Sequence, residues 1–67
     1  KAEAEAAYRK AIELAPDFAP AYNNLAWLLY LESNDLAIAK QFAEKAVELV
    51  PGNAEYQDTL QKIGAAL

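Results

Sequence analysis

The hydrophobic pattern of the chain centres on residues 20–32, PAYNNLAWLLYLE, which contain the single tryptophan and the densest run of large apolar side chains. Spacings of i, i+3, i+4 and i+7 place one stripe on a common helix face, formed by Tyr22, Leu25, Ala26 and Leu29. Trp27, Tyr30 and Leu31 fall on other faces. A helix that is apolar nearly all round must be buried on several sides, and any side left open is a candidate binding surface.

Helix-forming segments with an apolar stripe also precede and follow this stretch. Pro16 and Pro51 mark the ends of two of them, because proline disfavours helical geometry in the residue before it. Asp35, next to Ser33 and Asn34 in a polar break, is a good N-cap for the segment after it. The pattern predicts an all-α chain, a single domain over residues 1–67, with four antiparallel helices over residues 2–15, 20–32, 36–50 and 54–66.

The two halves of the chain repeat each other with a constant offset. The segment KAIELAPD at residues 10–17 matches KAVELVPG at residues 45–52. The same offset of 35 residues relates Pro16 to Pro51, Ala11 to Ala46, Ala4 to Ala39, Leu25 to Leu60 and Ala19 to Ala54. One helix-turn-helix unit therefore occurs about twice.

A helix-turn-helix period near 34 residues is typical of the tetratricopeptide repeat, and this chain resembles that family over nearly its whole length. The matching positions are Tyr22, Leu25, Ala26, Leu29, Asp35, Ala39, Ala46 and Pro51. Small residues are expected where the two helices of a repeat cross closely. The chain departs from the pattern by one extra residue in the Tyr22 helix or its turn, and by Ala43 at a place where an aromatic is common. We expect Phe42 or Trp27 to fill the resulting gap.

The resemblance implies an α-solenoid that acts as a protein-protein interaction module or scaffold, with the first helix of each repeat lining a groove for a peptide of the partner. Carried over by position, the partner-binding groove comprises Asn23, Asn24, Trp27, Tyr30, Leu31, Asp58 and Lys62. Trp27 and Tyr30 fit apolar anchors of a bound peptide, and they fit internal packing equally well. Some members bind a terminal carboxylate through lysines and an asparagine, but Asn23 and Trp27 occupy two of those positions here, which argues against that activity.

The resemblance also implies an order of helices. The helix over residues 2–15 corresponds to the second helix of a repeat, and the first helix of that repeat does not precede it in this sequence. Its stripe should then be partly uncovered and is a candidate self-association face, comprising Ala4, Ala7, Tyr8 and Ala11. At the other end, the positions equivalent to Tyr22 and Ala26 are Gln57 and Gln61, which favours a capping helix facing water. Head-to-tail assembly of copies is the alternative, a structural homo-oligomer of a truncated or engineered repeat.

The amino-acid composition excludes several classes of function. The chain has no cysteine and no histidine, which removes thiolate sites, the commonest metal ligand and the usual general base. Glu44 and Glu48 lie one turn apart, but with Lys40 and Lys45 nearby they indicate a solvated face. No catalytic motif occurs, and we expect no enzyme, no cofactor and no metal.

Charge and length bear on the partners. A net charge of −4 disfavours phosphate backbones and anionic membranes, and it argues against the pentatricopeptide repeat, a similar hairpin that reads single-stranded RNA. The apolar run Leu25–Leu31 is far shorter than the ~20 residues of a membrane span. We therefore expect a protein or peptide partner, no nucleic acid and no membrane. The chain opens on Lys1, as a trimmed fragment would, and no motif assigns a compartment.

Overall fold

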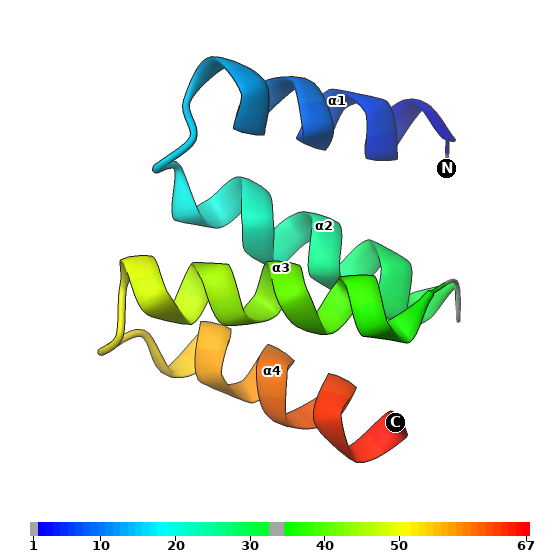
Figure 1. Cartoon of the computed structure of the whole chain (residues 1–67), viewed down its shortest axis with the longest axis vertical. Coiled ribbons are helices and arrows are strands. Elements are labelled where there is room, and N and C mark those ends of the chain that lie inside the picture. Colours follow the sequence, from blue (N-terminus) through cyan, green and yellow to red (C-terminus); the bar gives the residue numbers. More distant parts are fainter. Residues whose placement is uncertain (1, 33–34) are drawn as a thin grey trace.

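The computed structural model describes residues 2–32 and 35–67, and within them every regular element is a helix. These elements are α1 (Ala2–Leu14), α2 (Ala19–Leu31), α3 (Leu36–Leu49) and α4 (Ala54–Ala66), shown in Figure 1. The predicted all-α antiparallel repeat is confirmed. Ser33 and Asn34, the other members of the predicted polar break, lie outside the described residues.

The helix bounds differ from the predicted ones by one residue at four places. Helices α1, α2 and α3 end at residues 14, 31 and 49 instead of 15, 32 and 50, and α2 begins at residue 19 instead of 20. Ala15 and Val50 each still donate a backbone hydrogen bond to the preceding turn, at 2.9 and 3.0 Å, but both stand directly before a proline. The proline ring disfavours helical dihedrals in the residue before it, so each helix stops one residue early.

The starts of the helices differ in how they are capped. Asp35 is the N-cap of α3, as predicted, because the Ile38 N–H donates to its carboxylate at 3.2 Å. Its φ of 51° lies in the left-handed region, which aspartate tolerates better than most residues. Asn53 caps α4 by accepting the Tyr56 N–H at 3.0 Å. The equivalent N-cap of α2 is Phe18, which has no side-chain oxygen to offer.

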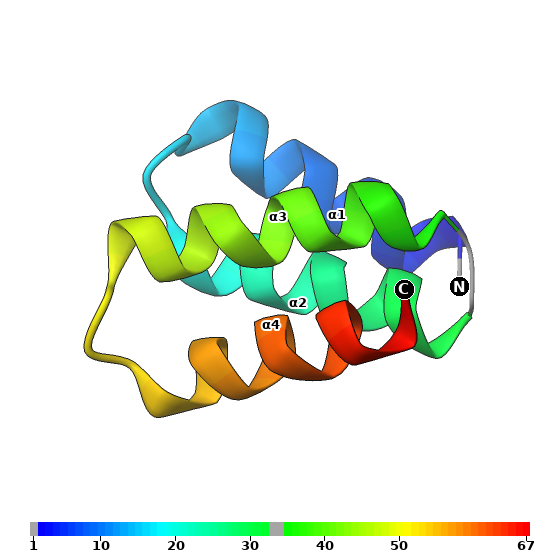
Figure 2. The same ribbon diagram turned by 60° about the horizontal axis from the view of Figure 1, so that its bottom comes forward.

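Helix α2 is the centre of the fold and packs against the other three helices. Figure 2 shows α1 and α3 along one side of the molecule and α2 and α4 along the other. The core buries Leu25 and Leu29 of α2 together with Ile63 of α4. Between α2 and α3, small side chains let the backbones approach closely, and each of them is completely buried: Ala26, Ala39, Ala43 and Ala46. The predicted apolar stripe of α2 is therefore its core face.

Phe42 fills the space next to Ala43. Its ring lies 6.2 Å from the ring of Tyr22, centroid to centroid, and it packs against both clusters of buried residues. Of the two side chains expected to compensate for the small Ala43, Phe42 is the one that does so. Trp27 belongs to neither cluster.

Helix α1 is the least anchored element. None of its side chains that the structure describes is fully buried. In the predicted self-association face, Ala7 is exposed, whereas Ala4, Tyr8 and Ala11 are half-buried. Tyr8 packs with Ile12 against the core of its own chain, so it contributes to folding as well as to the open edge.

The opposite edge of the array, on α4, is polar. Gln57 and Gln61 are both exposed. The Gln57 side chain donates to the Pro51 carbonyl, in the same way as the Tyr22 hydroxyl donates to the Pro16 carbonyl at 2.6 Å one repeat earlier. A glutamine thus reproduces the turn-fixing bond of the buried tyrosine while leaving a hydrophilic surface.

Candidate peptide-binding cleft

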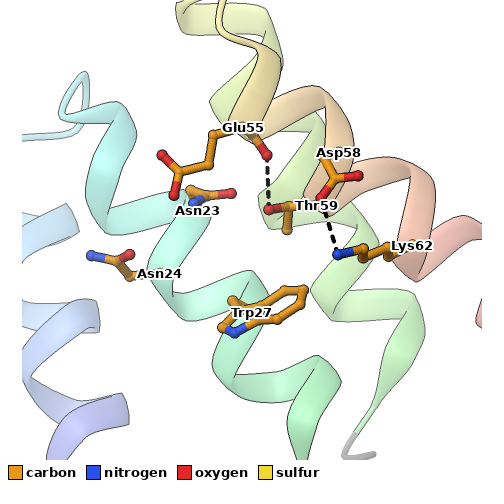
Figure 3. A pocket seen from close by; sticks show the side chains of 7 residues that line it. All are labelled: Asn23, Asn24, Trp27, Glu55, Asp58, Thr59 and Lys62. Carbon is orange, nitrogen blue, oxygen red and sulfur yellow. Dashed lines mark hydrogen bonds and ion pairs between the residues drawn. The ribbon is translucent and has the colours of Figure 1, made fainter.

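One cleft of the described structure lies between α2 and α4, the two helices of the same layer. Its volume is about 210 Å³, smaller than the ~300–1,000 Å³ of pockets that take small molecules. The lining residues, shown in Figure 3, are Asn23, Asn24, Trp27, Glu55, Asp58, Thr59 and Lys62.

Helical spacing explains why these side chains converge. Asn23 and Trp27 are one turn apart on α2, and on α4 a second stripe follows with spacings of three and four from Glu55 through Asp58 and Thr59 to Lys62. Thr59 is buried, and its hydroxyl donates to the Glu55 carbonyl at 3.0 Å within α4. The hydroxyl at the floor of the cleft therefore has its hydrogen-bond partner within α4, and the charged side chains lie at the rim.

Asn23 is the exception in this polar wall. It is only 7% exposed, and its Oδ1 has no hydrogen-bond partner among the residues that the structure describes. Burying an acceptor without a partner costs about 1–3 kcal/mol. Asn23 Oδ1 is therefore an unsatisfied acceptor in the wall of the cleft.

Trp27 forms the apolar part of the cleft. Its ring is half-buried and tilted against the Tyr30 ring, with centroids 5.2 Å apart. The Lys62 ammonium lies 5.3 Å from the centre of the Trp27 ring and 3.1 Å from the Asp58 carboxylate. The cleft therefore already holds one cation between an aromatic face and a carboxylate.

Comparison with known families identifies the repeat. The sequence profile described as tetratricopeptide repeat matches residues 7–41, which is 35 of the 67 residues. The chain belongs to the tetratricopeptide repeat family. The matched tetratricopeptide segment runs from within α1 through α2 into α3, so it includes the whole α2 wall of the cleft. Neither the curated proteins nor the solved structures include a significant match.

Family membership places the chain in a broad functional class. Tetratricopeptide repeats are generally protein-protein interaction modules, and the family is not enzymatic. The described part of the chain contains no group of three or more acidic side chains that could hold a metal ion. Glu48 instead pairs with Lys45 at 3.0 Å on the α3 surface, and this hydrogen bond raises the pKa of Lys45. Within the same residues, no helix combines the length and apolarity needed to cross a bilayer.

The cleft of this tetratricopeptide chain brings together most of the residues placed in the groove from sequence: Asn23, Asn24, Trp27, Asp58 and Lys62. Tyr30 and Leu31 do not line it. Tyr30 packs against the core and the Trp27 ring, and Leu31 is 61% exposed at the end of α2. Tyr30 and Leu31 stand three and four residues beyond Trp27, about one helical turn further along α2.

Two cleft residues, Glu55 and Thr59, are absent from the sequence prediction. Both follow from the helical period, since Glu55 lies three residues before Asp58 and Thr59 three residues before Lys62, which completes one stripe on α4. The signal was therefore present in the spacing. The burial of Thr59 arises only from tertiary packing, because its side chain is 5% exposed in the folded chain.

Proposed function

We propose that the chain binds an extended peptide segment of a protein partner in the cleft between α2 and α4. The observation that carries this proposal is the buried, unpartnered Oδ1 of Asn23 beside the half-buried ring of Trp27. The amide offers an acceptor to a donor of the peptide, and the indole offers an apolar surface for a side chain. Membership of a family of interaction repeats supports the same function, with binding rather than catalysis as the outcome.

The test is selection of peptides from a random displayed library on the immobilised chain, followed by calorimetric titration of the enriched peptides. Trp27→Ala should weaken binding at least about tenfold, the effect of losing an aromatic anchor. Leu31→Ala is the matched control, because it also truncates a large apolar side chain of α2 but lies outside the cleft. The proposal is refuted if no peptide is enriched, or if Trp27→Ala binds the enriched peptides as tightly as the unchanged chain.

A second candidate function is self-association through the α1 face formed by Ala4, Ala7, Tyr8 and Ala11. It is favoured by the absence of any fully buried side chain among the described residues of α1. The test is sedimentation equilibrium over a wide concentration range with Ala7→Glu. Ala7 is exposed, whereas Tyr8 also packs on its own core, so Ala7→Glu perturbs the face without destabilising the fold. A mass of one chain at every concentration rejects this function.

A further inference from the structure

The charges around the cleft carry information about its partner. Glu55 and Asp58 are the acidic side chains of the lining and Lys62 is the basic one, on a chain whose net charge is −4. The Lys62 ammonium pairs with Asp58, at 3.1 Å. The Glu55 carboxylate forms no ion pair among the described residues, so the cleft has one carboxylate more than it has cations.

The occupied part of the cleft shows which chemistry it accepts. Lys62 projects from the last turns of α4 so that its ammonium lies over Trp27, 5.3 Å from the ring centre, as drawn in Figure 3. A cation between an indole face and a carboxylate is a favourable arrangement that a ligand could reproduce. Both side chains of the Lys62–Asp58 pair are at least half exposed, and such a pair contributes little to stability. A ligand can therefore displace Lys62 from this pair at a small cost in free energy.

The part of the cleft near Asn23 and Glu55 contains hydrogen-bond acceptors and suits a ligand with hydrogen-bond donors. Asn23 Oδ1 is an acceptor without a partner, and Glu55 supplies carboxylate oxygens on the facing helix. In Figure 3 the Asn23 amide points from α2 towards α4. The Glu55 side chain is exposed in the first turn of α4, so its carboxylate is accessible to a ligand in the cleft. Two acceptor groups and an indole together match a side chain that has several donors and a positive charge.

We infer that the cleft selects a peptide with a basic side chain, arginine above all, whose guanidinium binds Glu55 and Asn23 and displaces Lys62 from the face of Trp27. This inference rests on the proposed peptide-binding function and adds the class of ligand. Arginine fits better than lysine because its planar group donates several hydrogen bonds at once and stacks on aromatic rings. An acidic peptide would meet the unpaired Glu55 and is disfavoured.

The experiment uses three short peptides with blocked ends in which alanine alternates with arginine, with citrulline or with glutamate. Citrulline has the shape of arginine without its charge. Binding is followed through the fluorescence of Trp27, the single tryptophan of the chain, at an ionic strength of about 0.15 M so that long-range attraction is screened. The arginine peptide should bind at least about tenfold more tightly than the citrulline peptide, and the glutamate peptide should bind least.

Three variants separate a specific site from general attraction to an acidic chain. Glu55→Gln should weaken binding of the arginine peptide about tenfold, whereas Glu48→Gln, the same charge change on the α3 surface, should alter it less than about twofold. Lys62→Gln should tighten binding several-fold, because the internal competitor is removed. All three positions are exposed, so these variants keep the fold.

The inference is overturned if Glu48→Gln weakens binding as much as Glu55→Gln, or if citrulline replaces arginine without loss. Its failure differs from failure of the proposed function. If neutral or acidic peptides bind in the cleft and basic ones do not, peptide binding stands and the choice of a basic side chain is wrong. If none of the three peptides binds and the displayed library yields none, both fail.

Discussion

Replacing Ile63 by alanine tests whether α4 is anchored to the rest of the array, and therefore whether the cleft exists as a fixed structure. Ile63 is completely buried and belongs to the cluster that includes Leu25 and Leu29 of α2. Removal of three carbon atoms at ~0.8 kcal/mol each gives about 2.4 kcal/mol of lost transfer free energy. The cavity left behind adds to this, and Ile-to-Ala changes in cores cost about 2–5 kcal/mol in total.

This magnitude is large for so short a chain. A domain of 67 residues has a free energy of unfolding of about 3–10 kcal/mol, so the Ile63→Ala variant should be partly or largely unfolded at room temperature. Ile63→Val removes a single carbon atom and should cost only about 1 kcal/mol. Leu67→Ala is the control from the same end of the chain, because Leu67 is 63% exposed and its loss should change stability by less than about 0.5 kcal/mol.

The assay is urea unfolding, followed both by far-UV circular dichroism and by the fluorescence of Trp27. Dichroism reports on all helices, whereas the indole lies against α4 and reports on the cleft. The two signals should move together to lower urea concentration in Ile63→Ala. If Ile63→Ala costs less than about 1 kcal/mol and resembles Leu67→Ala, then α4 does not depend on this contact and the argument for a preformed cleft fails.

Three further predictions concern other features of the array. Asp35→Ala should lower the free energy of unfolding by about 1–2 kcal/mol, because α3 loses its cap and alanine is strained at a φ of 51°; urea unfolding should show Asp35→Asn nearly unchanged. Ala43→Leu should cost about 1–3 kcal/mol, since Ala43 is completely buried between the helices, whereas Ala37→Leu on the exposed side of α3 should be nearly neutral in thermal unfolding; equal effects would contradict the close packing of α2 on α3. Amide hydrogen exchange should be faster in α1 than in α2, because no described side chain of α1 is fully buried; equal protection of both helices would mean that α1 is covered, for instance by a second copy.

Most of the architecture was predictable because it depends on local rules. Proline fixes where α1 and α3 end, Asp35 caps α3, and the apolar period of each helix selects its buried face. The offset of 35 residues then implied the pairing of helices, and the equivalent backbone hydrogen bonds at Ala15 and Val50 show that the two turns also repeat in structure. Helices α1 and α3 end one residue earlier than predicted. The residue before each proline keeps its backbone hydrogen bond to the last turn but not the helical dihedral angles.

The cleft was predictable as far as the family resemblance placed residues on the groove side of α2 and α4. Asn23, Asn24, Trp27, Asp58 and Lys62 were carried over in this way, and all five line the cleft. Tyr30 and Leu31 do not line the cleft, because Tyr30 packs against the core and the Trp27 ring and Leu31 is exposed at the end of α2. Phe42 and Trp27 were equivalent candidates to fill the gap at Ala43 until the packing of α3 against Tyr22 decided between them.

The sequence by itself determined the helices, their turns and the repeat, since these follow from contacts between residues close in the chain. Tertiary structure decided what is unpaired: the orphaned acceptor of Asn23, the position of Lys62 over Trp27, and the lack of a fully buried side chain among the described residues of α1. Burial and pairing depend on which other helix arrives opposite a side chain. The identity of the facing helix depends on how segments far apart in the sequence pack together, and a local pattern of residues does not specify that packing.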